Sequence, residues 1–340
     1  MMTKMLRGLL SCLSTTCLLL AGPAFAQDEL LVGNKSDDTV WRISLEDGRK
    51  LGAFATGQGP HEIAVSADQR LALVTEYGHQ QPGNTLSVVD TATGKVLRTV
   101  DLGKHKHPHG ARFLADGRRA LVTTEDSGAL LVVDIAQGKV ERAIAVGEGR
   151  GHMVAVSPDG MTAYVSKIEA GTVSRIDLDA GRKTGEVASG AGAEGIAVHR
   201  DGSVWVSNRE AGTVTVHDPA TLAVRTTLRS DGFPIRVAFT ADGSRALVTN
   251  AKAAELAVFD TKDFTRVATV ALAEKDGDYQ DTMLGKAALP IGVIADPARP
   301  RVYVAISGGN EIAVIDTDSW KVVERWQTGK EPDALGIVAK

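Results

Sequence analysis

Residues 57–103 read GQGPHEIAVSADQRLALVTEYGHQQPGNTLSVVDTATGKVLRTVDLG, and this phrase restarts seven times after residue 28. Each copy begins with a short apolar segment, makes a turn, and continues through a β-branched segment, a loop and more extended segments. The residues that open the copies are His61, His109, His152, Glu194, Ile235, Ile291 and Asp333. Their spacings are 48, 43, 42, 41, 56 and 42 residues. Such a period predicts supersecondary units that stack on one another to bury an apolar face.

Each copy contains four short β segments. Asp-Gly pairs, as at Asp116-Gly117 and Asp159-Gly160, follow the first segment and favour tight hairpin turns. The second segment is aliphatic or β-branched, as in LALVT at 71–75. The segments lack the 3.6-residue apolar spacing of a helical repeat. Four antiparallel strands in every unit are typical of a β-propeller blade.

The ends of the chain complete the ring. Six full copies span residues 57–103, 104–147, 148–190, 191–231, 232–287 and 288–329. The carboxyl-terminal EPDALGIVAK supplies only a first strand, and the amino-terminal ELLVGN, TVWRIS and GRKLGAFAT supply only strands two to four. The sequence therefore predicts an all-β, seven-bladed propeller over residues 27–340. Its last blade is closed by N- and C-terminal strands, which hides sheet edges.

The first 26 residues have the pattern of a secretory signal. Lys4 and Arg7 precede an apolar stretch, and Ala24-Phe25-Ala26 forms a small-residue cleavage site. We therefore expect a periplasmic mature protein that begins near Gln27 and has no transmembrane anchor. Both cysteines lie in this segment. The mature chain is thus expected to have no disulfide, no thiolate ligand and no covalently attached haem.

Charge and motifs exclude several function classes. The net charge is −4 for the whole chain, and losing Lys4 and Arg7 makes it more acidic. With only 4% aromatic residues, the chain lacks the basic and stacking surfaces of nucleic-acid-binding domains. It also lacks a Ser-His-Asp motif, a phosphate-binding glycine loop and a dinucleotide fingerprint.

Two segments resemble a known repeat. TLSVVDTATGKVLRTVDLG at 85–103 and PDGMTAYVS at 158–166 are similar to the YVTN-type repeat of YncE-like bacterial secreted propellers. The resemblance covers essentially all of residues 29–340 and implies the architecture. It implies less about function, because such propellers serve as binding proteins, lactonase-like enzymes and subunits of redox assemblies. DTATGKV at 90–96 is also similar to a repeat of quinone-dependent dehydrogenases. The tryptophan that docks their blades is missing, so we expect no quinone.

The opening residue of each first strand is expected at one mouth of the central channel. Three neighbouring blades place His61, His109 and His152 there, and ring closure brings Asp333 next to His61. Imidazoles with carboxylates are ordinary ligands of Zn, Cu, Mn or Fe. We predict these four residues as metal ligands. Alternatively, each histidine caps the packing between two blades and hydrogen-bonds a neighbouring loop.

A second set of rim positions follows the second strands. It comprises Asn34, Glu76, Thr124, Lys167, Asn208, Asn250 and Ile306. Glu76 and the mouth residue Glu194 are candidate catalytic groups that orient or deprotonate a metal-bound water. Lys167 and Arg236 are candidate anion-binding residues. The alternative is that these are solvated surface charges.

The 56-residue interval marks an insertion at 273–289. It is expected to form a lid over the same mouth, with Tyr279 and Met283 touching a ligand, or else to be a disordered surface loop.

Three functions remain open. The first is a periplasmic propeller that binds a metal ion, a small anionic ligand or both at the mouth lined by histidine and carboxylate. The second is a metal-dependent enzyme, either a lactonase-like hydrolase or a copper or iron oxidoreductase. The third is a scaffold for a protein partner in the cell envelope.

Overall fold

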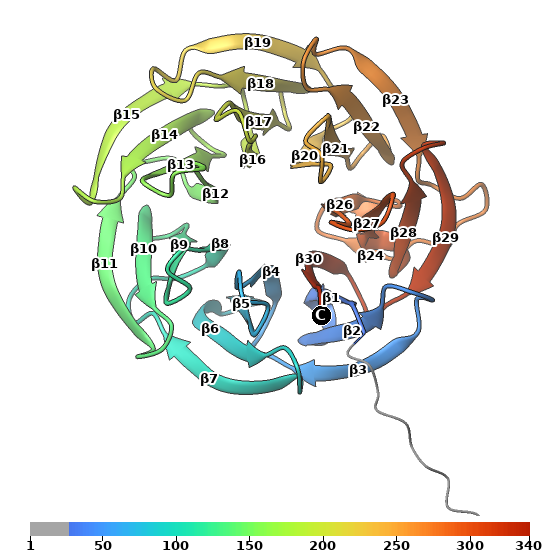
Figure 1. Ribbon diagram of the computed structural model, residues 1–340, viewed down its shortest axis with the longest axis horizontal. Helices are drawn as coiled ribbons and strands as arrows, with labels where there is room; N and C mark the ends of the chain where they lie inside the picture. The colour runs from blue at the N-terminus through green and yellow to red at the C-terminus, as the bar shows by residue number, and fades with distance from the viewer. Residues whose placement is uncertain (1–26) are drawn as a thin grey trace, which may run out of the picture.

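The computed structural model describes residues 27–340, which form a seven-bladed β-propeller (Figure 1). Each blade is a four-stranded antiparallel sheet, so the predicted fold class is confirmed. The predicted signal sequence at 1–26 lies outside the described residues. In the part of the chain that is described, no helix has the length and apolar character needed to cross a membrane.

Six blades are formed by strands that are consecutive in the chain. They are β4 (Pro60–Val65), β5 (Leu71–Gly78), β6 (Pro82–Asp90) and β7 (Lys95–Asp101); β8 (Pro108–Phe113), β9 (Arg119–Thr124), β10 (Ala129–Asp134) and β11 (Lys139–Ala145); β12 (Gly151–Val156), β13 (Thr162–Lys167), β14 (Thr172–Asp177) and β15 (Arg182–Ala188); β16 (Ala193–Val198), β17 (Val204–Asn208), β18 (Thr213–His217) and β19 (Val224–Arg229); β20 (Pro234–Phe239), β21 (Arg245–Asn250), β22 (Glu255–Asp260) and β23 (Arg266–Ala271); and β26 (Pro290–Ala295), β27 (Arg301–Ile306), β28 (Glu311–Asp316) and β29 (Lys321–Gln327).

The seventh blade combines both ends of the described chain. Its strand order is β3-β2-β1-β30, with bounds β3 (Lys50–Ala55), β2 (Thr39–Ser44), β1 (Glu29–Asn34) and β30 (Pro332–Val338). Strand β30 pairs with β1 along the register from Glu29↔Val338 to Asn34↔Pro332. The predicted closure by the N- and C-terminal strands is therefore confirmed.

The hydrophobic core lies between neighbouring blades. In one cluster, Leu73 and Val88 of the β4–β7 blade pack with Val122 and Leu131 of the β8–β11 blade, all at most 4% exposed. The outermost strands are polar and exposed, as in β7, where only Val100 is buried. A blade buries its apolar faces only against its neighbours, which is why the ring must close.

Short elements occupy the loops that connect the strands. Two 3-10 turns, η1 (Lys35–Asp37) and η2 (Ser307–Gly309), follow the second strands of the closing blade and the blade before it. The insertion at 273–289 contains a two-stranded hairpin, β24 (Asp281–Thr282) and β25 (Gly285–Lys286).

Figure 1 shows the seven first strands β4, β8, β12, β16, β20, β26 and β30 innermost around the axis. Glycines let these strands approach closely. A Cβ added to Gly195 would lie 2.2 Å from the carbonyl oxygen of Ile235, and one added to Gly292 would lie 1.9 Å from that of Asp333. Both obstacles are backbone atoms of the next blade, so these contacts fix how near adjacent first strands lie.

We therefore predict that Gly292→Ala lowers the free energy of unfolding by about 1–3 kcal/mol, because the new methyl group forces two backbones apart. Urea unfolding of residues 27–340 measures the change. Gly52→Ala is the matched control, since a Cβ at Gly52 in outer strand β3 meets no atom within 4 Å. Equal destabilisation by both substitutions would contradict this account of the inner ring.

Candidate metal centre

All seven opening residues of the repeat line one cavity of about 700 Å³ at a mouth of the channel. They are His61, His109, His152, Glu194, Ile235, Ile291 and Asp333. Each occupies the second position of its first strand, and all but His152 and Glu194 directly follow a proline. Ring closure therefore gathers residues that are up to 272 positions apart in the sequence.

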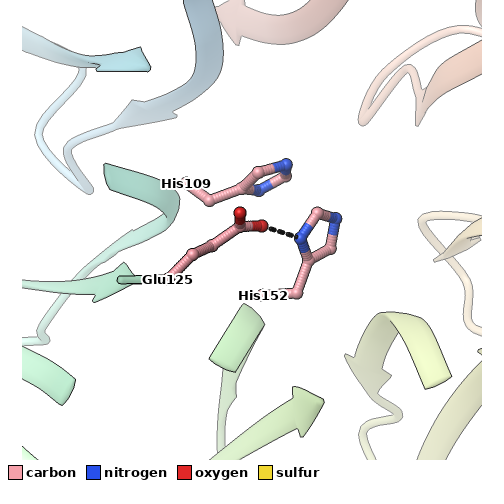
Figure 2. A group of neighbouring side chains, drawn as sticks. All are labelled: His109, Glu125 and His152. Atoms are coloured by element: carbon pink, nitrogen blue, oxygen red, sulfur yellow. Dashed lines mark hydrogen bonds and ion pairs between the residues drawn. The ribbon is translucent and has the colours of Figure 1, made fainter. Parts of the chain in front are cut away.

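His109, Glu125 and His152 form the compact group of this cavity (Figure 2). Each offers one ligand atom, and these atoms all lie within 4.8 Å of one another. All three side chains are buried, with exposures of 1%, 6% and 7%. His109 and His152 come from the first strands β8 and β12, whereas Glu125 directly follows β9.

The imidazoles of three neighbouring blades contact one another. The ring centroids of His61 and His109 lie 4.2 Å apart, and those of His109 and His152 lie 3.6 Å apart. Nδ1 of His61, Nδ1 of His109 and Nε2 of His152 are buried and have no hydrogen-bond partner. Buried polar atoms are normally paired, so unpaired nitrogens facing one cavity indicate a site for a ligand.

Burial keeps two of these imidazoles neutral. It lowers the pKa of His61 to about 3, although the charge of Asp333 opposes the shift. It also lowers the pKa of His109 well below its ordinary value, and the neighbouring histidines lower it further. Because a neutral imidazole has a free lone pair, both side chains are in the form that binds a metal.

His152 is held between two carboxylates. Its Nδ1 donates a hydrogen bond to Oε1 of Glu125 at 2.6 Å, and its Nε2 lies 3.6 Å from Oε1 of Glu194. Burial lowers the pKa of His152, but the two carboxylates outweigh burial and the net shift is upward. Burial raises the pKa of Glu125, but His152 and Tyr77 bring it down to about 2. Glu125 is therefore ionised.

Tyr77 supports Glu125 from the opposite side. Its hydroxyl donates to Oε2 of Glu125 at 2.6 Å. The Tyr77 ring stacks on His61 at 4.8 Å between centroids and packs against His107 at 4.5 Å. Burial and the negative charge of Glu125 raise the pKa of Tyr77, so its proton stays in place as a donor. This bond fixes the orientation of the carboxylate.

Basic side chains meet the other carboxylates of the cavity. Arg209 Nη1 donates to Glu194 at 2.9 Å, and Arg236 Nη1 lies 3.7 Å from the same carboxylate. Asp333 lies 3.5 Å from Lys35 and 3.9 Å from His61. Burial raises the pKa values of Glu194 and Asp333, but these cations and His152 produce a net lowering for both carboxyls.

Two predicted site residues point away from this cavity. Glu76 is 2% exposed and accepts hydrogen bonds from the Gly57 amide at 2.8 Å and from Thr85 and Ser87. Lys167 is 1% exposed; it donates to the carbonyl of Glu148 at 2.8 Å and pairs with Glu186. Both side chains therefore form hydrogen bonds and ion pairs with groups of their own blade and its loops. Neither lines the cavity, so the predicted catalytic role of Glu76 and ligand-binding role of Lys167 are replaced by structural ones.

The residues that do line the cavity come one position later. They are Lys35, Tyr77, Glu125, Ile168, Arg209 and Ser307, each directly following a predicted rim position. Side chains alternate between the two faces of a strand, so a shift of one residue exchanges the blade interior for the cavity. The repeat therefore contains a signal for Tyr77 and Glu125, because each lies one residue after a predicted rim position.

The insertion reaches the cavity through its hairpin. Asp281, Thr282, Met283 and Leu284 line the mouth, and Met283 is 88% exposed. Tyr279 lies elsewhere: its hydroxyl accepts a hydrogen bond from the Glu274 amide at 2.7 Å, and its ring packs against a blade core. Of the two side chains predicted to touch a ligand, Met283 lines the cavity and Tyr279 does not.

Comparison with known proteins finds curated relatives and solved structures that resemble this chain. No protein-family model matches it. It is 25% identical over 219 residues to the uncharacterized protein YncE of Salmonella typhi and, equally, to that of Salmonella typhimurium strain LT2. The match covers 63% of this chain, which thus aligns with only 60% of the length of these curated relatives.

Solved structures share the fold at lower identity. A functionally unknown protein from Desulfotomaculum acetoxidans DSM 771 superposes with a TM-score of 0.76 at 18% identity, covering 91% of this chain and 98% of the other. A chain of the hydrazine synthase of Kuenenia stuttgartiensis gives a TM-score of 0.71 at 20% identity, covering 81% and 88%. At these identities the likeness shows the fold alone. The repeat, the seven blades and the partial match make this chain similar to the YncE β-propeller proteins.

Proposed function

We propose that this propeller is an exported protein that binds one divalent transition-metal ion through His109, Glu125 and His152. The observation that carries the proposal is the grouping of their ligand atoms within 4.8 Å in a buried setting. Ligands of one ion lie about 2 Å from it, so a modest closing of the three side chains completes the site. Two imidazoles with a carboxylate suit Zn, Cu, Mn or Fe.

The surroundings support a small anionic ligand next to the ion. Nε of Arg209 and Nη1 of Arg236 are buried without hydrogen-bond partners, and both side chains line the cavity. Guanidinium groups bind carboxylates and phosphates through paired hydrogen bonds. His61 and Asp333 face the same space and add an imidazole and a carboxylate to the wall.

Metal-dependent hydrolysis is the second candidate function. Three protein ligands leave a coordination position open, as catalytic zinc sites do, and the 700 Å³ cavity gives a substrate access to it. Glu194, 3.6 Å from His152, is then the carboxylate placed to orient a metal-bound water.

We predict that the metal-free protein, residues 27–340, takes up one equivalent of Zn²⁺ or Cu²⁺. The double variant His109→Ala/His152→Ala should bind the ion at least about a hundredfold more weakly, because losing two ligands lowers metal affinity more than losing a group that only orients a ligand. Isothermal titration and elemental analysis measure affinity and stoichiometry. His105→Ala is the matched control, because His105 bonds Ser127 outside the cavity. A well-folded double variant that still binds one equivalent tightly would refute the site.

Tyr77→Phe removes the hydroxyl that orients Glu125 and leaves every ligand in place. We expect metal affinity to fall about 10–100-fold, the usual effect of losing a group that orients a ligand. Tyr164→Phe serves as the control, since its hydroxyl donates to the Pro219 carbonyl at 2.9 Å, remote from the group. Unchanged affinity in Tyr77→Phe would mean that Glu125 is not a ligand.

The open coordination position has a spectroscopic test. Azide added to the Co²⁺-loaded protein is expected to shift the visible absorption bands of the metal, because it enters the free position. A spectrum that azide leaves unchanged at saturating concentration would show a closed site and would argue for metal binding without hydrolysis.

A further inference from the structure

The channel has a second cavity at its opposite end, which we call the lower cavity. It has a volume of about 720 Å³ and is lined by first-strand residues such as Ala64, Arg112, Ala197 and Phe239. Arg236 and Asp333 line both this cavity and the one at the metal centre, so they lie between the two. Arg236 and Asp333 are the only residues of the lower cavity that the proposed function also uses.

One position of the repeat contributes a residue to this wall in six of the seven blades. Three residues after each opening residue, the seven copies have Ala64, Arg112, Ala155, Ala197, Ala238, Ile294 and Gly336. Six of these seven line the lower cavity. Small side chains there leave the channel wide and apolar, and Arg112 is the one charged residue at this position.

Arg112 has no acidic partner. Its Nη1 donates to its own neighbour, the carbonyl oxygen of Ala111, at 2.8 Å. Among residues 27–340, no carboxylate lies within 4.0 Å of its guanidinium, whereas the buried Arg236 lies within 4.0 Å of Glu62, Glu194 and Asp333. Burial lowers the pKa of Arg112, with Glu62 opposing the shift and Arg236 adding to it. Because an arginine keeps its charge in proteins, a partly buried positive charge is left without compensation.

The nearest acid is committed elsewhere. Glu62 accepts a hydrogen bond from Arg236 Nη2 at 2.6 Å, and both side chains are at most 8% exposed. Turning Glu62 toward Arg112 would leave Arg236 short of a partner, because Arg236 lies 3.7 Å from both Glu194 and Asp333. The free charge is therefore a stable feature of the lower cavity.

From these contacts we propose that the lower cavity binds a small molecule with a compact apolar body and one anionic group, a carboxylate or sulfonate, that pairs with Arg112. Ligand pockets of this size bury an apolar body and orient it through a few polar groups. A bidentate guanidinium–carboxylate pair supplies both charge compensation and direction. The alanine, valine and phenylalanine side chains of the wall receive the apolar part.

Two fluorescent probes of similar shape test the charge requirement. Anilinonaphthalenesulfonate carries an anionic group on an apolar body, and phenylnaphthylamine is its neutral counterpart. We expect the folded protein to bind one equivalent of the sulfonate. Arg112→Met should weaken this binding about tenfold or more, the value of one charged hydrogen-bonded pair, and change phenylnaphthylamine binding less than about twofold. Arg182→Met, on exposed outer strand β15, is the matched control and should change neither.

A blocking variant and a competition complete the test. Ala197→Phe fills the wall and should weaken both probes, whereas His109→Ala at the metal centre should weaken neither. On the wild-type protein, octanoate should displace the sulfonate probe at concentrations at which octanol does not. The proposal is overturned if Arg112→Met leaves sulfonate binding intact, if both probes weaken equally in it, or if octanol competes as well as octanoate. None of these outcomes depends on metal binding.

Discussion

The close approach of seven first strands around one axis is the constraint on which the rest of the molecule depends. No blade has a face that it can bury alone, since clusters such as that of Leu73, Val88, Val122 and Leu131 join side chains of two sheets. The last gap is closed by β30 pairing with β1, so the two ends of the described chain share one blade. Glycines such as Gly292, against the carbonyl of Asp333, let the inner strands meet without a gap.

This packing also creates the candidate metal centre. Each first strand begins at the same height on the ring, so residues that open successive copies must face one mouth. Burial of these imidazoles lowers the pKa values of His61 and His109 and keeps both neutral. Carboxylates stay ionised there only because Lys35, Arg209, Arg236 and His152 surround them. The same closure that stabilises the fold therefore concentrates lone pairs and negative charge in one small volume.

The repeat predicted the blade count, the closing blade and the ring of opening residues because all three follow from period alone. The repeat does not predict which of two consecutive residues at the end of a second strand faces the cavity. Glu76 and Lys167 lie on the blade side of their strands, while Tyr77 and Ile168, one residue later, face the cavity. Period-2 alternation predicts two faces but does not say which one meets the axis at a strand end. The prediction for Tyr279 is wrong for another reason. The insertion occurs in only one copy of the repeat, so no other copy indicates which of its side chains reaches the mouth.

Buried charged residues, among them Arg236 and Asp333, lie between the two cavities of the channel. The Glu62–Arg236 pair is hydrogen-bonded at 2.6 Å, and removing one partner of such a pair typically costs about 3–5 kcal/mol. Arg236 also lies between Glu194 and Asp333, so its charge is shared with the acids of the metal centre. Arg112 lines the same lower cavity as Glu62 and Arg236 but forms no ion pair with a carboxylate of residues 27–340. Arg236 is thus hydrogen-bonded to a carboxylate, whereas Arg112 is not. The proposed metal ion and the proposed anion of the lower cavity would therefore be held by different side chains, the His109–Glu125–His152 group and Arg112.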